Sequence, residues 1–266
     1  MLSIFKSNSG PSARKSNMRW LIATAAVIVA TPIAIWALNP GVPPGGNFNL
    51  SGFSLQLPIG SPGNPTIIPS SQLEGSSGYE NFSYFFTESG DGAMVMKVPG
   101  SPDDTGCVTT PNSTHCRTEL AENTSWNPNN APNREYATLA VTKADPTQYG
   151  TVIGQIHMDS SVSTKPVIEL YYASNGNITA GVEQTRAGGN EVMTYLTNVP
   201  LGTTFTYEIK YEDNTLVVNI NGNWYTLSTY SLDAPLSYFK AGNYNQSTDS
   251  QNGASDVHFL ALSIVH

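Results

Sequence analysis

Two short stretches of this chain place polar side chains on what would be single faces of β-strands. Arg117 and Glu119 are two positions apart, and Gln155 and His157 have the same spacing. Because successive side chains on a strand point to opposite faces, each pair shares one face. A guanidinium, an amide and an imidazole would together supply hydrogen-bond donors and a group that transfers protons.

A third stretch, residues 238–246, shows the same alternation over a longer run. Gly242 lies within it, and we expect a ligand to approach the backbone there, where no side chain intervenes. If the three stretches form neighbouring strands, one sheet face carries cations and amides beside proton-transfer groups. The polar residues that share a face of the third stretch are Tyr238, Lys240, Tyr244 and Gln246.

Each stretch alone has a plainer interpretation. A single histidine on a strand is more often structural than catalytic, and Arg117 with Glu119 would ordinarily be an ion pair worth little. Tyr238 and Tyr244 would ordinarily be packing residues with a hydrated hydroxyl. Only the three stretches together, in this order, favour a catalytic interpretation.

Together they resemble polysaccharide lyase family 7, the jelly-roll alginate lyases. The family signatures are Arg-Ser/Thr-Glu-Leu-Arg, Gln-Ile/Val-His and Tyr-Phe-Lys-Ala-Gly-x-Tyr-x-Gln, and this chain matches them at residues 117–120, 155–157 and 238–246. Residues 50–58, a hydrophobic run that ends in Leu-Pro, are similar to the family's first strand. The resemblance covers residues 47–266.

The resemblance implies β-elimination at a 4-linked uronate, in which the C5 proton is removed and the C4 oxygen is expelled. Because an ionised carboxylate keeps that proton from being acidic, donors must neutralise it, and Arg117, Gln155 and His157 would do so. Tyr244 would be the proton shuttle, with its pKa lowered by Arg117 or Lys240. For one uronate epimer Tyr244 would be both base and acid, whereas for the other His157 would be the base.

The other polar residues of the signatures are the candidates for substrate binding. We expect endo cleavage of alginate or a related anionic polysaccharide, giving unsaturated oligouronates. The chemistry requires no cofactor, and the sequence offers no ligand cluster for a metal. The binding candidates are Glu119, Lys240, Tyr238 and Gln246.

One position departs from the family pattern. Ala121 stands where the family has a second arginine, on the face that Arg117 shares, so the cleft lacks one cationic contact. A lyase for another polyuronate, such as glucuronan, is therefore an alternative. A non-catalytic carbohydrate-binding sandwich is a further alternative, although such a protein would be expected to lack Gln155, His157 or Tyr244.

The composition predicts an all-β protein. Only 12% of the 266 residues are charged, whereas Gly (23), Pro (18) and Tyr (13) are abundant. Tyr suits pleated surfaces, and Gly and Pro end elements. Strand-like runs such as residues 204–227, with an Asn221-Gly222 turn, indicate an antiparallel β-sandwich or jelly roll with an open substrate cleft on one sheet.

The N-terminal region has a different character from the rest. Four bases and no acid precede or border an apolar run at residues 20–38, which is long enough to cross a bilayer core of ~30 Å. We predict that residues 1–38 are a signal peptide or a signal anchor, residues 39–46 a Pro/Gly-rich linker, and residues 47–266 the catalytic domain. The body would be extracellular, secreted or anchored, and monomeric.

The remaining features agree with export. The body holds eight bases and twenty acids, and no basic patch supports nucleic-acid binding. Cys107 and Cys116 are the only cysteines, which in an oxidising compartment predicts one disulfide. Because Cys116 directly precedes Arg117, this disulfide would restrain the start of the first catalytic strand. Asn245 belongs to a glycosylation sequon inside the third signature, and we expect it to be unoccupied. The other sequons begin at Asn49, Asn81, Asn112, Asn123 and Asn177.

Overall fold

The computed structural model describes residues 37–248 and 253–266, which form two β-sheets and three short helices. One sheet contains β1 (Phe53–Ser61), β2 (Asn64–Ile68), β5 (Arg117–Glu122), β7 (Thr151–Met158), β8 (Pro166–Tyr172), β9 (Asn177–Val182), β10 (Val192–Asn198) and β14 (Ser237–Tyr244). The other contains β3 (Phe85–Thr87), β4 (Met94–Val98), β6 (Arg134–Lys143), β11 (Phe205–Glu212), β12 (Thr215–Ile220), β13 (Asn223–Leu227) and β15 (Ser255–Val265). The helices are α1 (Pro44–Asn47), α2 (Ser70–Leu73) and α3 (Pro102–Thr105).

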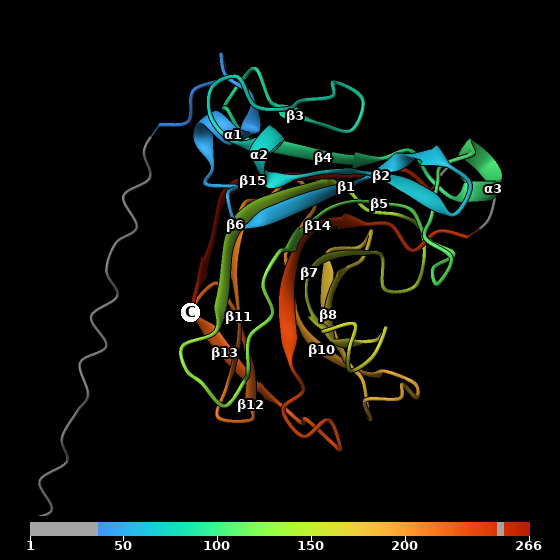
Figure 1. Cartoon of the computed structure of the whole chain (residues 1–266), viewed down its shortest axis with the longest axis vertical. Coiled ribbons are helices and arrows are strands. Elements are labelled where there is room, and N and C mark those ends of the chain that lie inside the picture. Colours follow the sequence, from blue (N-terminus) through green and yellow to red (C-terminus); the bar gives the residue numbers. More distant parts are fainter. Residues whose placement is uncertain (1–36, 249–252) are drawn as a thin grey trace, which may run out of the picture. The chain divides into compact units, whose positions relative to one another are not determined.

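The two sheets pack face to face as a sandwich (Figure 1). Their strand orders are β10-β9-β8-β7-β14-β5-β1-β2 and β13-β12-β11-β6-β15-β4-β3. The paired strands within each sheet are antiparallel. The prediction of an antiparallel β-sandwich is therefore confirmed.

The predicted three-strand meander is present as β11, β12 and β13. Its turns fall at Asp213-Asn214 and Asn221-Gly222, where all four residues have positive φ, as the primed turns of hairpins require. Along β11 the side chains alternate between buried and half-buried, with Tyr207 and Ile209 in the core. This alternation is what a sheet needs when one face packs on a second sheet and the other faces solvent.

The strands that carry the three signatures also divide their side chains between two faces. Leu120 of β5, Ile156 of β7 and Phe239 of β14 are fully buried in the core between the sheets. Since neighbours along a strand point the opposite way, the residues on either side of them face outward from the sandwich. The hydrophobic positions thus fix which polar residues lie on the outer face.

The predicted linker is in contact with the body. Asn47 accepts a hydrogen bond from the backbone N–H of Asn39 at 2.8 Å and donates to the carbonyl of Gly92 at 3.3 Å. Pro44 is buried in α1, and Leu38 packs on the core. Residues 39–46 are therefore a docked segment and not a free spacer, because side-chain hydrogen bonds and apolar contacts fix them.

The predicted signal peptide or anchor lies outside the described residues, except for its last two positions. Within residues 37–248 and 253–266, no helix has the length and apolar character needed to cross a membrane. The expected disulfide is present, with the Cα atoms of Cys107 and Cys116 6.2 Å apart.

Candidate active site

The outer face of the eight-stranded sheet is hollowed by a cleft of about 650 Å³. Its lining extends from Gln56 on β1 across β5, β14, β7 and β8 to Glu191, which directly precedes β10. The loop that contains Ser113 and the loop that contains Lys165 contribute to its walls. An open cleft on one sheet, as the sequence predicts, is thus present.

Strand pairing brings the three signatures together in this cleft. β14 lies between β5 and β7, so the predicted neighbours are neighbours in the sheet. Across β14 and β5, Tyr244 pairs with Arg117. Across β14 and β7, Lys240 pairs with Gln155 and Tyr238 pairs with His157. Residues more than a hundred positions apart in the chain therefore share one surface.

Glu119 lies beneath this surface and is only 2% exposed. Its Oε2 accepts from Arg117 at 3.0 Å and from Lys240 at 2.5 Å, while its Oε1 accepts from Gln155 Nε2 at 2.5 Å. Burial alone would raise the pKa of Glu119, but Lys240 and Arg117 outweigh burial and lower it to about 2. With both oxygens occupied and no place in the cleft lining, Glu119 holds its three partners in position.

The contacts of Gln155 and His157 fix which of their atoms face a ligand. A carboxylate only accepts hydrogen bonds, so the Gln155 group beside Glu119 is the amide nitrogen. Among the described residues its second N–H has no acceptor, and it can donate to a ligand in the cleft. His157 Nδ1 lies 2.8 Å from the carbonyl of Met158, which also only accepts. Nδ1 therefore carries the proton, and Nε2 of the neutral ring has a free lone pair. Burial and then the charge of Lys240 lower the pKa of His157 to about 4.

The ring of Tyr244 stacks against the guanidinium of Arg117, which is one of the three partners of Glu119. The guanidinium carbon of Arg117 lies 3.5 Å from the centroid of the Tyr244 ring. We expected cations to lower the pKa of this phenol, and that expectation is wrong for the free protein. Burial raises the pKa of Tyr244, because the free-energy cost of burying a phenolate exceeds the stabilisation that the charge of Arg117 gives it.

The loop closed by the disulfide contributes two residues that the signatures do not reveal. Ser113 Oγ lies 3.1 Å from the Tyr244 hydroxyl and accepts from Arg117 Nη2 at 3.3 Å. The ring of His115 meets the Tyr244 ring edge-on, with centroids 5.9 Å apart. The position of this loop directly before Cys116 and Arg117 was the available signal, since a short closed loop must stay near the strand it enters.

Gly242 has a different role from the one expected. A Cβ at this position would lie 2.6 Å from the Thr118 carbonyl and 2.7 Å from the Cα of Glu119. Gly242 therefore allows β14 and β5 to approach each other, and it does not line the cleft. The reason is an irregularity in the β14–β7 pairing between Ala241 and Tyr244, where the alternation is interrupted.

The remaining predicted binding residues lie on the cleft surface. Tyr238 contacts the His157 ring, with centroids 5.3 Å apart, and burial raises its pKa to about 12. Gln246 lines the cleft, and its side chain donates to the carbonyl of Tyr244 at 3.2 Å. Ala121 lines it opposite Lys240, so the position of the missing arginine does face the cleft. Among the described residues, no group of three or more His, Cys, Asp or Glu has a geometry that could hold a metal ion.

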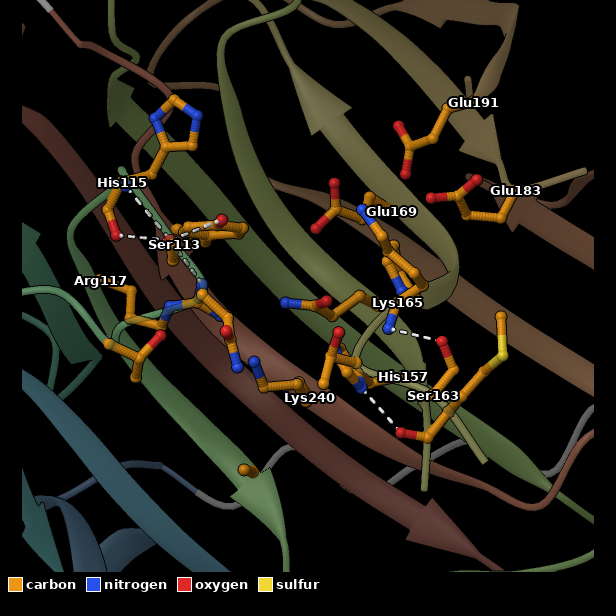
Figure 2. Close-up of a pocket in the computed structure, with 18 of the residues that line it drawn as sticks. Ser113, His115, Arg117, His157, Ser163, Lys165, Glu169, Glu183, Glu191 and Lys240 are labelled. Carbon is orange, nitrogen blue, oxygen red and sulfur yellow. Dashed lines mark hydrogen bonds between the residues drawn. The ribbon is translucent and has the colours of Figure 1, made fainter. Parts of the chain in front are cut away.

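A second group that sequence reasoning missed lies on the other side of the cleft. Figure 2 shows Glu169, Glu183 and Glu191 there, away from Ser113 and Arg117. The first lies on β8, the second directly follows β9, and the third directly precedes β10. No spacing rule connects them, because they come together only through the pairing of three strands.

Comparison with known proteins identifies the family. Residues 48–266 match the family model described as alginate lyase. An alginate lyase from Klebsiella pneumoniae is 30% identical over 298 residues, covering 84% of this chain and 91% of that protein. The chain therefore belongs to the alginate lyase family, and the resemblance drawn from the three signatures is confirmed.

Solved structures agree with this assignment. The family 7 alginate lyase A1-II′ in complex with substrate (GGMG) superposes with a TM-score of 0.73 at 29% identity, covering 85% of this chain and 97% of the other. An alginate lyase from Pseudomonas aeruginosa gives a TM-score of 0.68 at 29% identity, covering 82% and 99%. The fold and the family thus define a polysaccharide lyase of the jelly-roll type.

Proposed function

We propose that this chain cleaves alginate by β-elimination, with Arg117, Gln155, His157 and Tyr244 as the catalytic residues. The observation that carries the proposal is the order β7-β14-β5, which gathers these four side chains on one cleft surface. Membership of the alginate lyase family supports the reaction class. The roles of the individual residues follow from their contacts.

Arg117 and Gln155 neutralise the uronate carboxylate. As charge from C5 spreads into this carboxylate in the transition state, a guanidinium and an amide N–H stabilise it without having to reorganise. Their shared anchor on Glu119 fixes both donors before the substrate arrives. Lys240, on the same anchor, adds positive charge to this side of the cleft.

The protonation states of the free protein suit one of the two stereochemical routes. In guluronate the C5 proton and the C4 oxygen lie on opposite faces of the ring, so base and acid must be different groups. His157 is neutral above a pH of about 4 and has a free lone pair on Nε2, as a base requires. Tyr244 keeps its proton and can donate it to the leaving oxygen. We therefore propose a preference for bonds that present guluronate.

In mannuronate the proton and the leaving oxygen lie on the same face, and one group can serve both. Tyr244 would then act as a phenolate that takes the C5 proton and returns it to the C4 oxygen. Arg117 against its ring stabilises that phenolate, but burial opposes it. This route is slower in our proposal, because the phenol must first lose its proton.

Ser113 prepares Tyr244 for proton transfer. Arg117 Nη2 and the backbone N–H of His115 both donate to Ser113 Oγ, at 3.3 and 3.1 Å, and so occupy its two lone pairs. The hydroxyl of Tyr244 therefore cannot donate to Ser113, and its proton is directed into the cleft. In the free protein the hydroxyl of Ser113 donates to the His115 carbonyl at 3.1 Å. Once Tyr244 has given up its proton, Ser113 breaks that bond and donates to the phenolate, which is the stronger acceptor.

A relative supports the assignment of the proton-transfer pair. The form of A1-II′ captured with substrate (GGMG) carries a histidine-to-asparagine and a tyrosine-to-phenylalanine substitution. A form with the tyrosine substitution alone is in complex with product (GGG). In our proposal His157 and Tyr244 are the corresponding residues of this chain.

We further propose endo cleavage by an exported monomer. The cleft crosses the sheet from Gln56 to Glu191, which suits binding within a long polymer. The Cys107–Cys116 disulfide favours an oxidising compartment, and the apolar run at residues 20–38 would direct export or anchor the chain. Glycosylation at exposed sequons outside the cleft lining, such as Asn123, belongs to the same proposal.

Glucuronan is the alternative substrate, and Ala121 is the observation that favours it, since the cleft lacks a cation opposite Lys240. The test uses the full-length chain, purified with detergent, on polymannuronate, polyguluronate and glucuronan separately. Ultraviolet absorbance of the unsaturated product reports cleavage. We expect the largest signal on polyguluronate. A signal on glucuronan alone would replace alginate as the substrate, and no signal from folded protein would reject the lyase proposal.

A further inference from the structure

Strand β7 carries one extra residue relative to β8, directly before the second signature. Val152 and Gly154 are two positions apart on β7, yet they pair with neighbouring residues of β8. Ile153, the extra residue, is fully buried in the core between the sheets. A Cβ on Gly154 would also point into this core, so two successive positions of the strand face inward. This is a β-bulge, which changes the direction of the side chains that follow it.

The bulge lies between the two proton-transfer residues. Tyr244 of β14 pairs with Val152 on one side of the bulge, whereas Gln155 and His157 follow on the other side. A slip of one residue in a strand turns every following side chain to the opposite face. The bulge therefore decides whether His157 shares the cleft surface with Tyr244.

Tyr207 of β11 reaches the bulge from the opposite sheet. Its side chain is fully buried, and its hydroxyl lies 3.2 Å from the carbonyl oxygen of Ile153. The hydroxyl has room because position 154 is a glycine, where a Cβ would lie only 2.6 Å from the phenol oxygen. A polar group from one sheet is thus placed against the backbone of the bulge in the other.

Glu135 of β6 orients the Tyr207 hydroxyl. Its Oε1 lies 2.8 Å from that hydroxyl, and burial raises the pKa of Glu135 well above 4.5, so the carboxyl keeps its proton. A proton on Oε1 is donated to the phenol oxygen, which leaves the single hydrogen of Tyr207 for the carbonyl of Ile153. The reverse arrangement would put the carboxyl hydrogen on Oε2, which has no partner among the described residues.

The β14 half of the same irregularity is held by a second polar side chain. Asn243 is fully buried, and its Oδ1 accepts from Thr151 at 2.7 Å and from Ser255 at 2.6 Å. Its Nδ2 donates to the carbonyl of Met96 at 2.9 Å. Ser255 and Met96 belong to the opposite sheet, as Tyr207 does. Both strands are therefore fixed at the bulge by hydrogen bonds that cross the sandwich.

We infer that Tyr207, oriented by Glu135, is a positioning residue for the proton transfer, an inference that rests on the proposed function. By fixing the bulge it places Gln155 and His157 relative to Tyr244. Neither Tyr207 nor Glu135 lines the cleft, so both act only through β7. The guluronate route depends most on this placement, because its base and its acid stand on different strands.

The main test is Tyr207→Phe in the full-length chain, which removes only the hydroxyl at the bulge. On polyguluronate kcat should fall about tenfold with KM unchanged, since misplacing reacting groups by ~1 Å can cost 10²-fold. On polymannuronate kcat should fall less, because Tyr244 alone transfers the proton on that route. No fall, or an equal fall on both polymers, would overturn the inference.

Tyr211→Phe is the matched control on the same strand. Its hydroxyl is 2.8 Å from Asn214 Oδ1 in a turn, and its ring is fully buried like that of Tyr207. This variant should leave the ratio of the two rates unchanged, even where stability decreases. The same change of ratio in both variants would overturn the inference, because any buried hydroxyl would then have the effect. Should only one polymer be cleaved, kcat on that polymer is compared between the two variants in the same way.

Two substitutions test the carboxyl of Glu135. Glu135→Gln keeps a neutral donor for the phenol oxygen and should retain most activity, whereas Glu135→Leu should reproduce the effect of Tyr207→Phe. Equal losses would overturn the role of Glu135.

A spectroscopic measurement covers a variant that fails to fold. The infrared difference between the unaltered protein and Glu135→Gln at neutral pH should contain the carbonyl band of a protonated carboxyl. Carboxylate bands in its place would overturn the orientation of Tyr207 by Glu135. Absence of cleavage by the unaltered protein rejects the proposed function, whereas an unchanged rate ratio in Tyr207→Phe rejects only this inference.

Discussion

The two sides of the cleft solve the problem of buried charge in opposite ways. On the β5–β7–β14 side, one carboxylate, Glu119, is surrounded by Arg117, Lys240 and the amide of Gln155. On the β8–β10 side, carboxyls face one another, and a phenol bridges Glu169 and Glu191.

This contrast shows in the direction of the pKa shifts. Lys240 and Arg117 lower the pKa of Glu119 to about 2, so that it stays ionised and keeps its donors in place. Burial and the charge of Glu169 raise the pKa of Glu191 to about 8, so that it stays protonated. Burial is common to both groups, and the neighbouring charges decide the outcome. One side thus holds an ionised carboxylate among donors, and the other keeps a carboxyl protonated.

The β5–β7–β14 side, which carries Arg117 and Lys240, is the cationic side of the cleft. The largest effect should come from removing the reacting hydroxyl of Tyr244 on this side. Tyr244→Phe keeps the ring beside Arg117 but removes the proton donor, and a general acid contributes about 10²–10⁴-fold. We expect kcat to fall by that factor in the absorbance assay. Tyr238→Phe is the control and should retain most activity. A mild loss in Tyr244→Phe would move the acid role to another group.

Glu119→Gln and Glu169→Gln test the contrast directly, because the same isosteric change is made on each side. Removing one partner of a buried ion pair costs about 3–5 kcal/mol, so Glu119→Gln should lower the free energy of unfolding markedly. Glu169→Gln removes a repelling charge and should leave stability unchanged or raised. Urea denaturation of both variants measures the difference, and equal losses would contradict the contrast.

The pH dependence of stability should follow the same residue. The pKa of Glu119 is about 2 in the folded protein, below its ordinary value of 4.5. Its contribution is therefore complete above pH 4.5 and is lost as pH falls toward 2. Glu119→Gln should unfold with a weaker pH dependence across this window than the unaltered protein. The same slope in both would assign acid unfolding to other carboxyls.

Opening the disulfide should have an intermediate effect on the cationic side. A double Cys107→Ser and Cys116→Ser variant releases the loop that holds Ser113 and should lose about 2–4 kcal/mol of stability. Heat resistance and activity should both decrease, because Ser113 lies within the loop that this bond closes and Arg117 directly follows Cys116. Thermal unfolding and the absorbance assay measure the two losses. Unchanged behaviour in both would remove any role for the bond.

The smallest effect is expected from Ser113→Ala, which removes one hydroxyl beside Tyr244. A hydrogen bond to a charged group is worth about 1.5–3 kcal/mol, so kcat should fall roughly 10–100-fold with little change in KM. Ser113→Thr keeps the hydroxyl and should restore most of the rate. A loss in KM alone would make Ser113 a binding residue, contrary to its proposed positioning of Tyr244.

Much of the cationic side could be predicted from sequence because strand alternation is local. Arg117 and Glu119 share a face for the same reason that Leu120 is buried, and the Asn221-Gly222 turn shows its own geometry. The depth at which Glu119 lies and the direction of the Tyr244 pKa depend on what covers them, which a single strand does not reveal.

The acidic side could not be predicted in this way. Glu169 lies on β8, whereas Glu183 directly follows β9 and Glu191 directly precedes β10. The order of these three strands in the sheet is known only from the fold. Gly242 was misinterpreted for a similar reason, since its close neighbour is the backbone of β5 and not a ligand. A site built from several strands can be predicted from the sequence only when its residues belong to the signatures of a known family.

The burial of Asn245 sets a limit on when this molecule can be modified. Its side-chain nitrogen is fully enclosed and donates to the Gly253 carbonyl and, at 2.8 Å, to Ser255 Oγ at the start of β15. A sugar on that nitrogen and the closed sheet exclude each other. In a glycosylating host, closure of β15 and sugar transfer would compete in time, and a glycan at Asn245 would mark molecules in which transfer came first.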